Sequence, residues 1–200
     1  GLRLTGLHAH IGSQIYEPES LAEAADRLVA FAGAMRRVYG FELLELSPGG
    51  GWGVPMTDDD GPAPVKPYVS VLLAAIESGC RRHDLPLPHV VLEPGRSLVA
   101  RAAVALYTAG GRKEVPGVRT YVAVDGGMAD NIRPALYGAR YAAVRVGAPA
   151  AGADLERVTI AGKYCESGDV LLRDVTLPRL APGDLLAIPM AGAYTLSMAS

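Results

Sequence analysis

The chain has 200 residues, of which 50% are apolar and 20% are charged, a composition typical of a globular protein. No apolar run approaches the roughly 18 residues that a membrane span needs. The formal charge of -2 and the absence of a Lys/Arg stripe argue against a nucleic-acid surface. Two hundred residues are also too few for a complete (β/α)8 barrel, which takes about 250 residues, together with a second domain. We therefore expect neither a nucleic-acid nor a membrane partner.

Two cysteines, Cys80 and Cys165, are too few for a disulfide framework. The opening GLRLTGLHAH lacks the charged and apolar regions of a secretory signal peptide. Both features favour a cytoplasmic location. Because the sequence does not begin with Met, we expect a processed or trimmed chain or a fragment.

The first hundred residues predict alternating strands and helices. Apolar runs at 2–10, 43–47 and 89–93 favour strands, and helical periodicity covers 21–38 and 69–83. Ser20 followed by Glu23 is typical of a capping box opening the first helix. Crossovers of this length indicate parallel strands in an α/β unit.

The pattern changes after about residue 97, and we place a loose boundary near 97–110. The rest consists of short β-branched or apolar runs separated by Gly/Pro/Asp turns, which predict antiparallel β structure. The runs are VALYTAG, RTYVAVDGG, YAAVRVG, RVTIAGKY, DVLLRDVTL and DLLAIPMAG.

Polar motifs follow each of the three predicted parallel strands: HAHIGSQ, SPGGGWG and EPGR. Functional side chains in α/β units collect at the carboxyl ends of parallel strands. We therefore expect a His, a glycine-rich loop, a Glu and an Arg to converge on one face.

Each motif also has a structural interpretation. The glycines at 49–51 suit a phosphate-binding backbone, but also a tight turn. His8 and His10 share one face of a strand; we favour a hydrogen-bonded core role for His8 and a functional role for His10. Glu93 follows four apolar residues, so it needs a cationic or proton-sharing partner. That partner is either a ring nitrogen of a ligand or, structurally, Arg96.

These motifs, followed by VDGGMADNIRPALYGARY, GKYCESGD and AGAY with SMAS, resemble the motif series of the diaminopimelate decarboxylases. This branch belongs to the alanine racemase-like, fold-type III decarboxylases that use pyridoxal 5'-phosphate (PLP). The resemblance covers nearly the whole chain and implies a TIM barrel joined to a C-terminal β domain. It assigns residues 1–100 to a partial TIM (β/α)8 barrel, its last three βα units. Residues 101–200 would be a C-terminal antiparallel β domain, barrel- or sandwich-like, whose C-terminal end is truncated.

The resemblance also implies a cofactor site. The histidine matching His10 stacks on the pyridine ring, and the glutamate matching Glu93 keeps the pyridine nitrogen protonated, so that the ring accepts electrons. The implied PLP-binding residues are His10, Ser13, Gly50, Gly51, Glu93, Pro94, Gly95, Arg96 and Tyr194.

The implied reaction converts meso-diaminopimelate to L-lysine and CO2. Guanidinium groups suit carboxylates, and the substrate's second amino-acid centre must be held while the first reacts. Cys165 would donate a proton to the reacting carbon from the partner subunit of a homodimer, which makes the active site a shared one. The implied substrate-binding residues are Arg96, Arg133, Tyr137, Glu166 and Tyr194.

The sequence departs from the family pattern in one important position. The family lysine that links the cofactor lies in an earlier strand, in a motif ending Lys-Ala-Asn, which is absent. The lysines present, Lys66, Lys113 and Lys163, lack that context. About five of the eight barrel strands are also missing. We therefore expect the C-terminal portion of a longer enzyme, inactive on its own.

Three other functions remain open. One is a decarboxylase for another amino acid, of the ornithine or carboxynorspermidine type. Another is a PLP-binding or partner-binding homologue without catalysis. The most distant is a metal hydrolase using His8 and His10, which would need further ligands at other strand ends. His89 lies at the start of its predicted strand and His83 just past a predicted helix, so neither can reach that edge of the sheet.

Overall fold

The computed structural model describes residues 1–57, 60, 65–147 and 154–200. The chain divides into two compact units. The first comprises Gly1–Val54 and Gly61–Leu98, and the second comprises Pro55–Asp60 and Val99–Ser200. Among the described residues, no helix is both long and apolar enough to cross a membrane.

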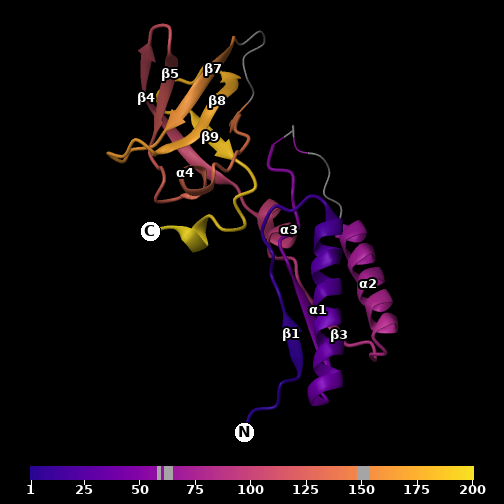
Figure 1. Cartoon of the computed structure of the whole chain (residues 1–200). Coiled ribbons are helices and arrows are strands. Elements are labelled where there is room, and N and C mark those ends of the chain that lie inside the picture. Colours follow the sequence, from indigo (N-terminus) through magenta and orange to yellow (C-terminus); the bar gives the residue numbers. More distant parts are fainter. Residues whose placement is uncertain (58–59, 61–64, 148–153) are drawn as a thin grey trace. The chain divides into compact units, whose positions relative to one another are not determined.

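The first unit is a three-stranded parallel sheet with two long helices. The sheet order is β1-β2-β3, so the predicted parallel strands are confirmed. Figure 1 shows α1 and α2 side by side along the sheet. The elements are β1 (Gly6–His8), α1 (Pro18–Tyr39), β2 (Glu45–Gly50), α2 (Val65–Arg82), β3 (His89–Glu93) and α3 (Gly95–Val99).

Two of the predicted strand boundaries are wrong. The first strand is shorter than 2–10, and the second runs on through Gly50. Two glycines of the expected loop, Gly49 and Gly50, therefore lie within β2, where they pair with Leu92 and Glu93 of β3. Glycine is required at both positions because a Cβ there would collide with the backbone of the Ala9 and Glu93 segments.

The predicted capping box is also wrong. The N-cap of α1 is Glu17, which makes no side-chain capping bond, and Pro18 begins the helix. Proline suits this position because it needs no hydrogen-bond acceptor and its φ is already helical. Ser20 instead donates to the Glu17 carbonyl at 3.0 Å, and Glu23 accepts from Arg27 one turn later. The proline thus starts the helix two residues before the predicted cap.

The core of the first unit lies between the helices and one face of the sheet. Leu21, Val29, Leu46, Leu72 and Ile76 are each at most 1% exposed. Full burial of such a side chain contributes about 1.5–3 kcal/mol. Trp52 and Cys80 are buried in the same core: Trp52 stacks on Tyr68 with ring centroids 5.5 Å apart, and Cys80 is 2% exposed.

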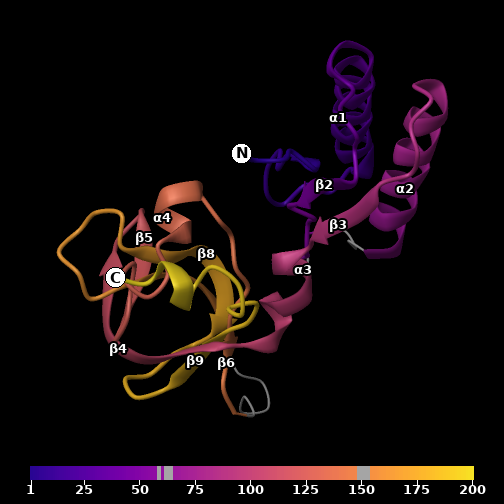
Figure 2. The ribbon, with the colours of Figure 1, turned by 90° about the horizontal axis from the view of Figure 1, so that it is seen from below.

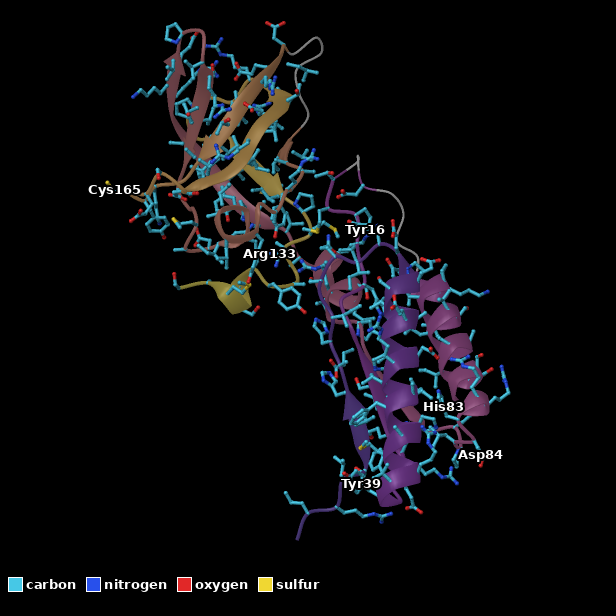
Figure 3. The ribbon with its side chains drawn as sticks, in the orientation of Figure 1. Tyr16, Tyr39, His83, Asp84, Arg133 and Cys165 are labelled. Carbon is cyan, nitrogen blue, oxygen red and sulfur yellow. The ribbon has the colours of Figure 1, made fainter. Side chains whose placement is uncertain are left out.

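Two glycines allow α1 and α2 to approach closely. A Cβ at Gly33 would lie 2.8 Å from the Cβ of His83, and a Cβ at Gly79 would lie 3.0 Å from Val29 Cγ1. Near the same end, Arg36 donates to the Asp84 carbonyl at 2.7 Å; Figure 3 labels His83 and Asp84 there. The close approaches at Gly33 and Gly79 explain why glycine stands inside these two helices, although a helical glycine costs about 1 kcal/mol relative to alanine.

The second unit is a six-stranded sheet with the order β6-β9-β4-β5-β7-β8. Its edge strands β6 and β8 contact each other, so the sheet is nearly closed, and Figure 2 shows its strands curving around a common interior. Each of the six predicted runs contains a strand. They are β4 (Ala105–Val115), β5 (Arg119–Val124), β6 (Val144–Arg145), β7 (Leu155–Ala161), β8 (Val170–Pro178) and β9 (Leu185–Ile188); α4 (Arg133–Tyr137) precedes β6.

The expectation of a purely antiparallel sheet is wrong. Strands β5 and β7 pair in parallel, with Val122 opposite Ile160, whereas the other four strand pairs are antiparallel. A parallel pair needs a crossover of a dozen or more residues. The segment between Val124 and Leu155, which contains α4 and β6, supplies it. Alternating runs alone did not reveal this crossover because they specify strands and not their partners.

The interior of the second unit combines apolar strand residues with two buried tyrosines, Tyr107 and Tyr141. Val122, Val158, Ile160 and Leu186 are each at most 1% exposed. Tyr107 on β4 is 5% exposed, and burial, with nearby carboxylates including Asp130, raises its pKa to about 12. At neutral pH this buried group is therefore uncharged.

Partly buried ion pairs connect strands of the second unit. In each pair a guanidinium faces a carboxylate with two hydrogen bonds, the geometry that makes such pairs strongest. The pairs are Arg112 with Glu156, Arg119 with Asp174, and Arg145 with Asp184.

We predict that Gly33→Ala lowers the free energy of unfolding, although alanine favours helices. The added methyl must displace His83, and overpacking of this kind costs about 1–3 kcal/mol. Urea unfolding monitored by circular dichroism measures the change. Gly111→Ala is the control, since nothing lies within 4 Å of its added Cβ; equal stability of the Gly33 variant and the wild type would contradict the close approach.

We predict that Tyr107 makes stability sensitive to alkaline pH. Its folded-state pKa of about 12 exceeds the ordinary value of 10.0. The stabilisation is therefore complete below pH 10 and is lost as the pH rises through 12. Two pKa units correspond to about 2.7 kcal/mol, which solvent screening reduces to about 1–2 kcal/mol. Unfolding of the wild type and of Tyr107→Phe at pH 8 to 12 measures it. The phenylalanine variant should lose less stability over this range, and parallel curves would contradict the prediction.

Candidate active site

The carboxyl ends of β1, β2 and β3 lie next to one another, so their polar residues meet. In the strand register His8 lies opposite Ser47, and Gly50 lies opposite Glu93. The predicted convergence at the end of β1–β3 is therefore observed for the His, Gly and Glu motifs of the first unit.

Glu93 is the hub of this cluster. Its carboxylate lies 3.1 Å (Oε1) and 3.2 Å (Oε2) from His8 Nε2, and Ser47 Oγ donates to Oε1 at 3.1 Å. These hydrogen bonds, from His8 first and then Ser47, hold the pKa of the Glu93 carboxyl below its ordinary value. Glu93 is thus a carboxylate at neutral pH, about half exposed and able to accept a further hydrogen bond.

Arg96, the structural alternative as a partner for Glu93, is 4% exposed, and its Nη2 donates to Ser13 Oγ at 3.1 Å. The assignment of His8 to the core is wrong. Its imidazole is hydrogen-bonded, as expected, but 53% of the side chain is exposed. His8 therefore belongs to the site, a role that the strand pattern alone did not single out.

His10 is held by the backbone of β2. The Gly50 N–H donates to His10 Nδ1 at 3.3 Å. A nitrogen that accepts a hydrogen bond carries no proton, so the ring is neutral with its proton on Nε2. The ring is exposed at the end of the sheet, where it can lie flat against an aromatic ligand.

The three glycines that follow Pro48 bring backbones into direct contact. A Cβ at Gly50 would lie 1.8 Å from the Glu93 carbonyl oxygen, and one at Gly51 would lie 2.0 Å from that of Gly12. Gly49 and Gly51 also have φ of 75° and 85°, which favour glycine. Any side chain here would push apart the segments that carry His10, Ser13 and Glu93.

Pro94 and Gly95 connect Glu93 to Arg96 through the start of a short helix. The Pro94 carbonyl accepts hydrogen bonds from Ser97 Oγ at 2.8 Å and from the Leu98 N–H at 3.2 Å. Gly95 is the first residue of α3. This turn aims the Arg96 guanidinium back at Ser13, so the HIGSQ and EPGR motifs are joined by a side-chain hydrogen bond.

Two residues that the sequence did not single out also position the HIGSQ segment. The Gln14 side chain donates to the Val54 carbonyl and accepts from the Val54 N–H, both at 3.0 Å. Tyr16, labelled in Figure 3, donates its hydroxyl to the same carbonyl at 2.7 Å. Together they bind the chain after β1 to the chain after β2. The final Gln of HIGSQ was the available signal for this contact.

In the second unit, three predicted substrate residues form a cluster. Arg133, at the start of α4, is 8% exposed. Its guanidinium carbon lies 5.4 Å from the centre of the Tyr137 ring and 6.0 Å from that of Tyr194. Its Nε has no hydrogen-bond partner among the described residues. A buried donor of this kind is costly unless a ligand satisfies it.

Tyr194 reaches this cluster on an unusual backbone. Its φ is 58°, a left-handed value that only a few per cent of non-glycine residues adopt. The side chain is 43% exposed. Such strain persists where the surrounding structure holds a side chain in place, here beside Arg133.

Cys165 and Glu166 lie on an exposed loop between β7 and β8, and Figure 3 shows Cys165 at its tip. The loop is fixed by Asp169, which is 3% exposed. Its carboxylate accepts from the N–H groups of Tyr164 at 2.7 Å and Met128 at 2.6 Å. Since Met128 follows the VDGG turn, Asp169 ties the two motifs together. The thiol of Cys165 is unpaired with another cysteine.

None of the three lysines lies at the carboxyl ends of β1–β3. Lys66 is in the first turn of α2, and Lys113 is in β4. Lys163 Nζ lies 5.6 Å from the centre of the Tyr164 ring. Among the described residues there is also no group of three metal-binding side chains.

Comparison with known families gives two matches. Residues 1–100 match the family model "Pyridoxal-dependent decarboxylase, pyridoxal binding domain". Residues 52–192 match "Pyridoxal-dependent decarboxylase, C-terminal sheet domain". Together they cover nearly the whole chain.

Individual relatives agree with the family match. The chain is 47% identical over 202 residues to the diaminopimelate decarboxylase of Bacillus subtilis (strain 168), a match that covers 100% of this chain and 45% of that protein. It thus spans about half the length of the curated relatives it matches.

Solved structures share the fold. The diaminopimelate decarboxylase of M. jannaschii in complex with L-lysine matches with a TM-score of 0.89 and 35% identity, over 98% of this chain and 44% of that one. The lysine/ornithine decarboxylase of Vibrio vulnificus in complex with cadaverine matches with a TM-score of 0.82 and 27% identity, over 100% of this chain and 51% of that one. On the family matches and these relatives, the chain belongs to the pyridoxal-dependent decarboxylases.

Proposed function

We propose that the full protein containing this chain uses PLP to decarboxylate meso-diaminopimelate, giving L-lysine and CO2. The B. subtilis relative carries the name of this activity, and the M. jannaschii relative was solved with L-lysine, the product. The observation that carries the proposal is the ionised Glu93 carboxylate at the joined ends of three parallel strands.

The residues at these strand ends fit the cofactor. When bound, PLP supplies a protonated pyridine ring that accepts the electrons left as CO2 departs. Glu93 is anionic and keeps acceptor capacity, so it holds a proton at the pyridine nitrogen. His10 is neutral, because Gly50 donates to its Nδ1, and its face packs on the ring without competing for that proton.

The phosphate would lie among Ser13, the backbone of Gly50 and Gly51, and the Pro94–Gly95–Arg96 turn. Arg96 already bonds Ser13, which places a buried cation and a hydroxyl donor together. Gly51 has no Cβ between its backbone N–H and a ligand, whereas the Gly50 N–H already donates to His10. This donor set suits a phosphate dianion.

The substrate would be held by Arg133, Tyr137 and Tyr194 in the second unit. A planar guanidinium binds a carboxylate with paired hydrogen bonds, and the Nε of Arg133 has no other partner among the described residues. Diaminopimelate carries a distal carboxylate for this role, beyond the reacting centre. The rings of Tyr137 and Tyr194 both contact the Arg133 guanidinium, and these contacts keep it oriented.

Cys165 would donate the proton that replaces the departing carboxylate, and Glu166 would bind the distal ammonium group. Both lie on an exposed loop held by Asp169, which suits a role in the active site of a partner subunit within a homodimer. A thiol that transfers protons must stay reduced, which supports a cytoplasmic location.

The lysine that links the cofactor is not at these strand ends, so we propose that the rest of the full protein supplies it. The chain spans 45% of its B. subtilis relative, which leaves ample sequence for that residue. The 200-residue chain alone should release no CO2 from meso-diaminopimelate.

A second candidate is the decarboxylation of lysine or ornithine, since the V. vulnificus relative matches the whole chain. Neither substrate has a distal carboxylate for Arg133. Turnover of meso-diaminopimelate in competition with ornithine and lysine therefore separates the two proposals.

We predict that the full protein with PLP forms L-lysine and CO2 in equal amounts from meso-diaminopimelate. Glu93→Gln should lower kcat about 100-fold or more, because the amide does not hold the pyridine proton. Amino-acid analysis and trapped CO2 measure the products. Glu45→Gln, at the far end of β2, is the matched control and should keep kcat; the absence of lysine formation by the wild type would refute the proposed function.

We predict that Cys165→Ala abolishes most activity, whereas Cys80→Ala keeps kcat because Cys80 is buried in α2. If the active site is shared, mixing the Cys165→Ala and Glu93→Gln proteins restores activity. After random subunit exchange, half of the dimers are heterodimers, and each heterodimer has one intact active site out of two. The recovered activity should therefore approach about a quarter of the wild-type value. No recovery after verified subunit exchange would show that Cys165 acts within its own subunit.

A further inference from the structure

We propose that His8 is a positioning residue, which holds the Glu93 carboxylate in the orientation and charge state needed to keep a proton on the pyridine nitrogen. This inference rests on the proposed function and deepens it. His8 does not touch the cofactor in this proposal; it acts through Glu93.

The strand register creates the contact. His8 ends β1, its partner Ser47 is in β2, and Glu93 ends β3. His8 Nε2 lies within 3.2 Å of both carboxylate oxygens, whereas Ser47 bonds only Oε1. Among the hydrogen-bonding side chains of the described residues, the imidazole is therefore the one that contacts both oxygens, and it resists rotation of the carboxyl group.

The direction of each hydrogen bond is fixed. The Gly49 N–H donates to Ser47 Oγ at 3.3 Å, so the serine hydroxyl hydrogen is free to point at Glu93 Oε1. An ionised carboxylate only accepts, so His8 must carry its proton on Nε2. Two donors thus approach from the strand side, and a carboxylate with about four acceptor sites keeps room for the ring N–H.

Loss of the His8 donor has a defined chemical consequence. The carboxyl group could then rotate about its last bond, held only by Ser47. Its pKa would rise, because the His8 hydrogen bond is the largest cause of its lowering. The shared proton would shift from the ring nitrogen toward Glu93. His10 is the other titratable group acting on this carboxyl, and it stays in place.

The test compares His8→Leu, which has no donor, with His8→Gln, whose amide N–H can still reach Glu93, in the full protein. His89→Leu is the matched control. It removes a similar His–Glu pair from the other end of β3, where His89 Nδ1 lies 3.8 Å from Glu45. The readouts are the Kd of PLP for the apoprotein and the pH dependence of the bound cofactor's absorbance.

We expect His8→Leu to weaken PLP binding about tenfold, the effect of one hydrogen bond to a charged group. The absorbance titration should shift as the ring nitrogen loses its proton at lower pH. His8→Gln should restore most of both properties, and His89→Leu should match the wild type. Wild-type Kd and titration in His8→Leu would overturn the inference.

A cofactor-free measurement separates this inference from the proposed function. The Glu93 carboxyl pKa, from 13C NMR of labelled protein without PLP, should be higher in His8→Leu than in the wild type. If the wild type binds no PLP, the proposed function fails. If the Glu93 pKa is the same in His8→Leu as in the wild type, the His8–Glu93 coupling is overturned as well. Should His8→Leu not fold, Ser47→Ala with intact His8 should give a smaller pKa rise than His8→Asn.

Discussion

The parallel pairing of β1, β2 and β3 is the constraint on which the candidate site depends. Parallel strands end at the same edge of a sheet, and this register puts His8 opposite Ser47 and Gly50 opposite Glu93. A slip of one residue would turn every side chain to the opposite face and would separate His8 from Glu93. The close backbone contacts at Gly50 and Gly51 resist such a slip. The glycines thus maintain the register as well as leaving space for a ligand.

In the second unit a buried carboxylate, that of Asp169, holds the loop that carries Cys165. Asp169 accepts hydrogen bonds from the N–H groups of Tyr164 and Met128. Loops have no ladder of their own hydrogen bonds, so a short exposed loop needs such an anchor to hold a reactive side chain in place. The loop's conformation therefore depends on a residue four positions beyond Cys165, so the residue that anchors the loop is distinct from the thiol that the loop exposes.

The sequence predicted the positions of most strands and helices, because hydrophobic periodicity reports which face is buried. It also predicted that the HIGSQ, GGG and EPGR motifs meet, since parallel strands require it. It did not predict which side chains pair there. Periodicity places His8 on a face but cannot show that β2 sets Ser47 beside it, so His8 was assigned to packing. The parallel β5–β7 pair was missed for the same reason, since partner choice is a long-range property. At the start of α1, local proline geometry outweighed the Ser20–Glu23 pattern.

The choice of partners for Glu93 has a chemical logic. A bidentate arginine would occupy both carboxylate oxygens and hold a permanent positive charge beside any pyridinium that approached. Histidine and serine instead leave acceptor capacity, and only one of them can carry a charge. Directing Arg96 to Ser13 keeps that fixed cation for an anionic group such as a phosphate. In the proposed function, one short turn, Pro94–Gly95, thereby separates the residue that would hold a protonated ring from the residue that would hold an anion. This division of charge within four consecutive residues is what a zwitterionic cofactor requires.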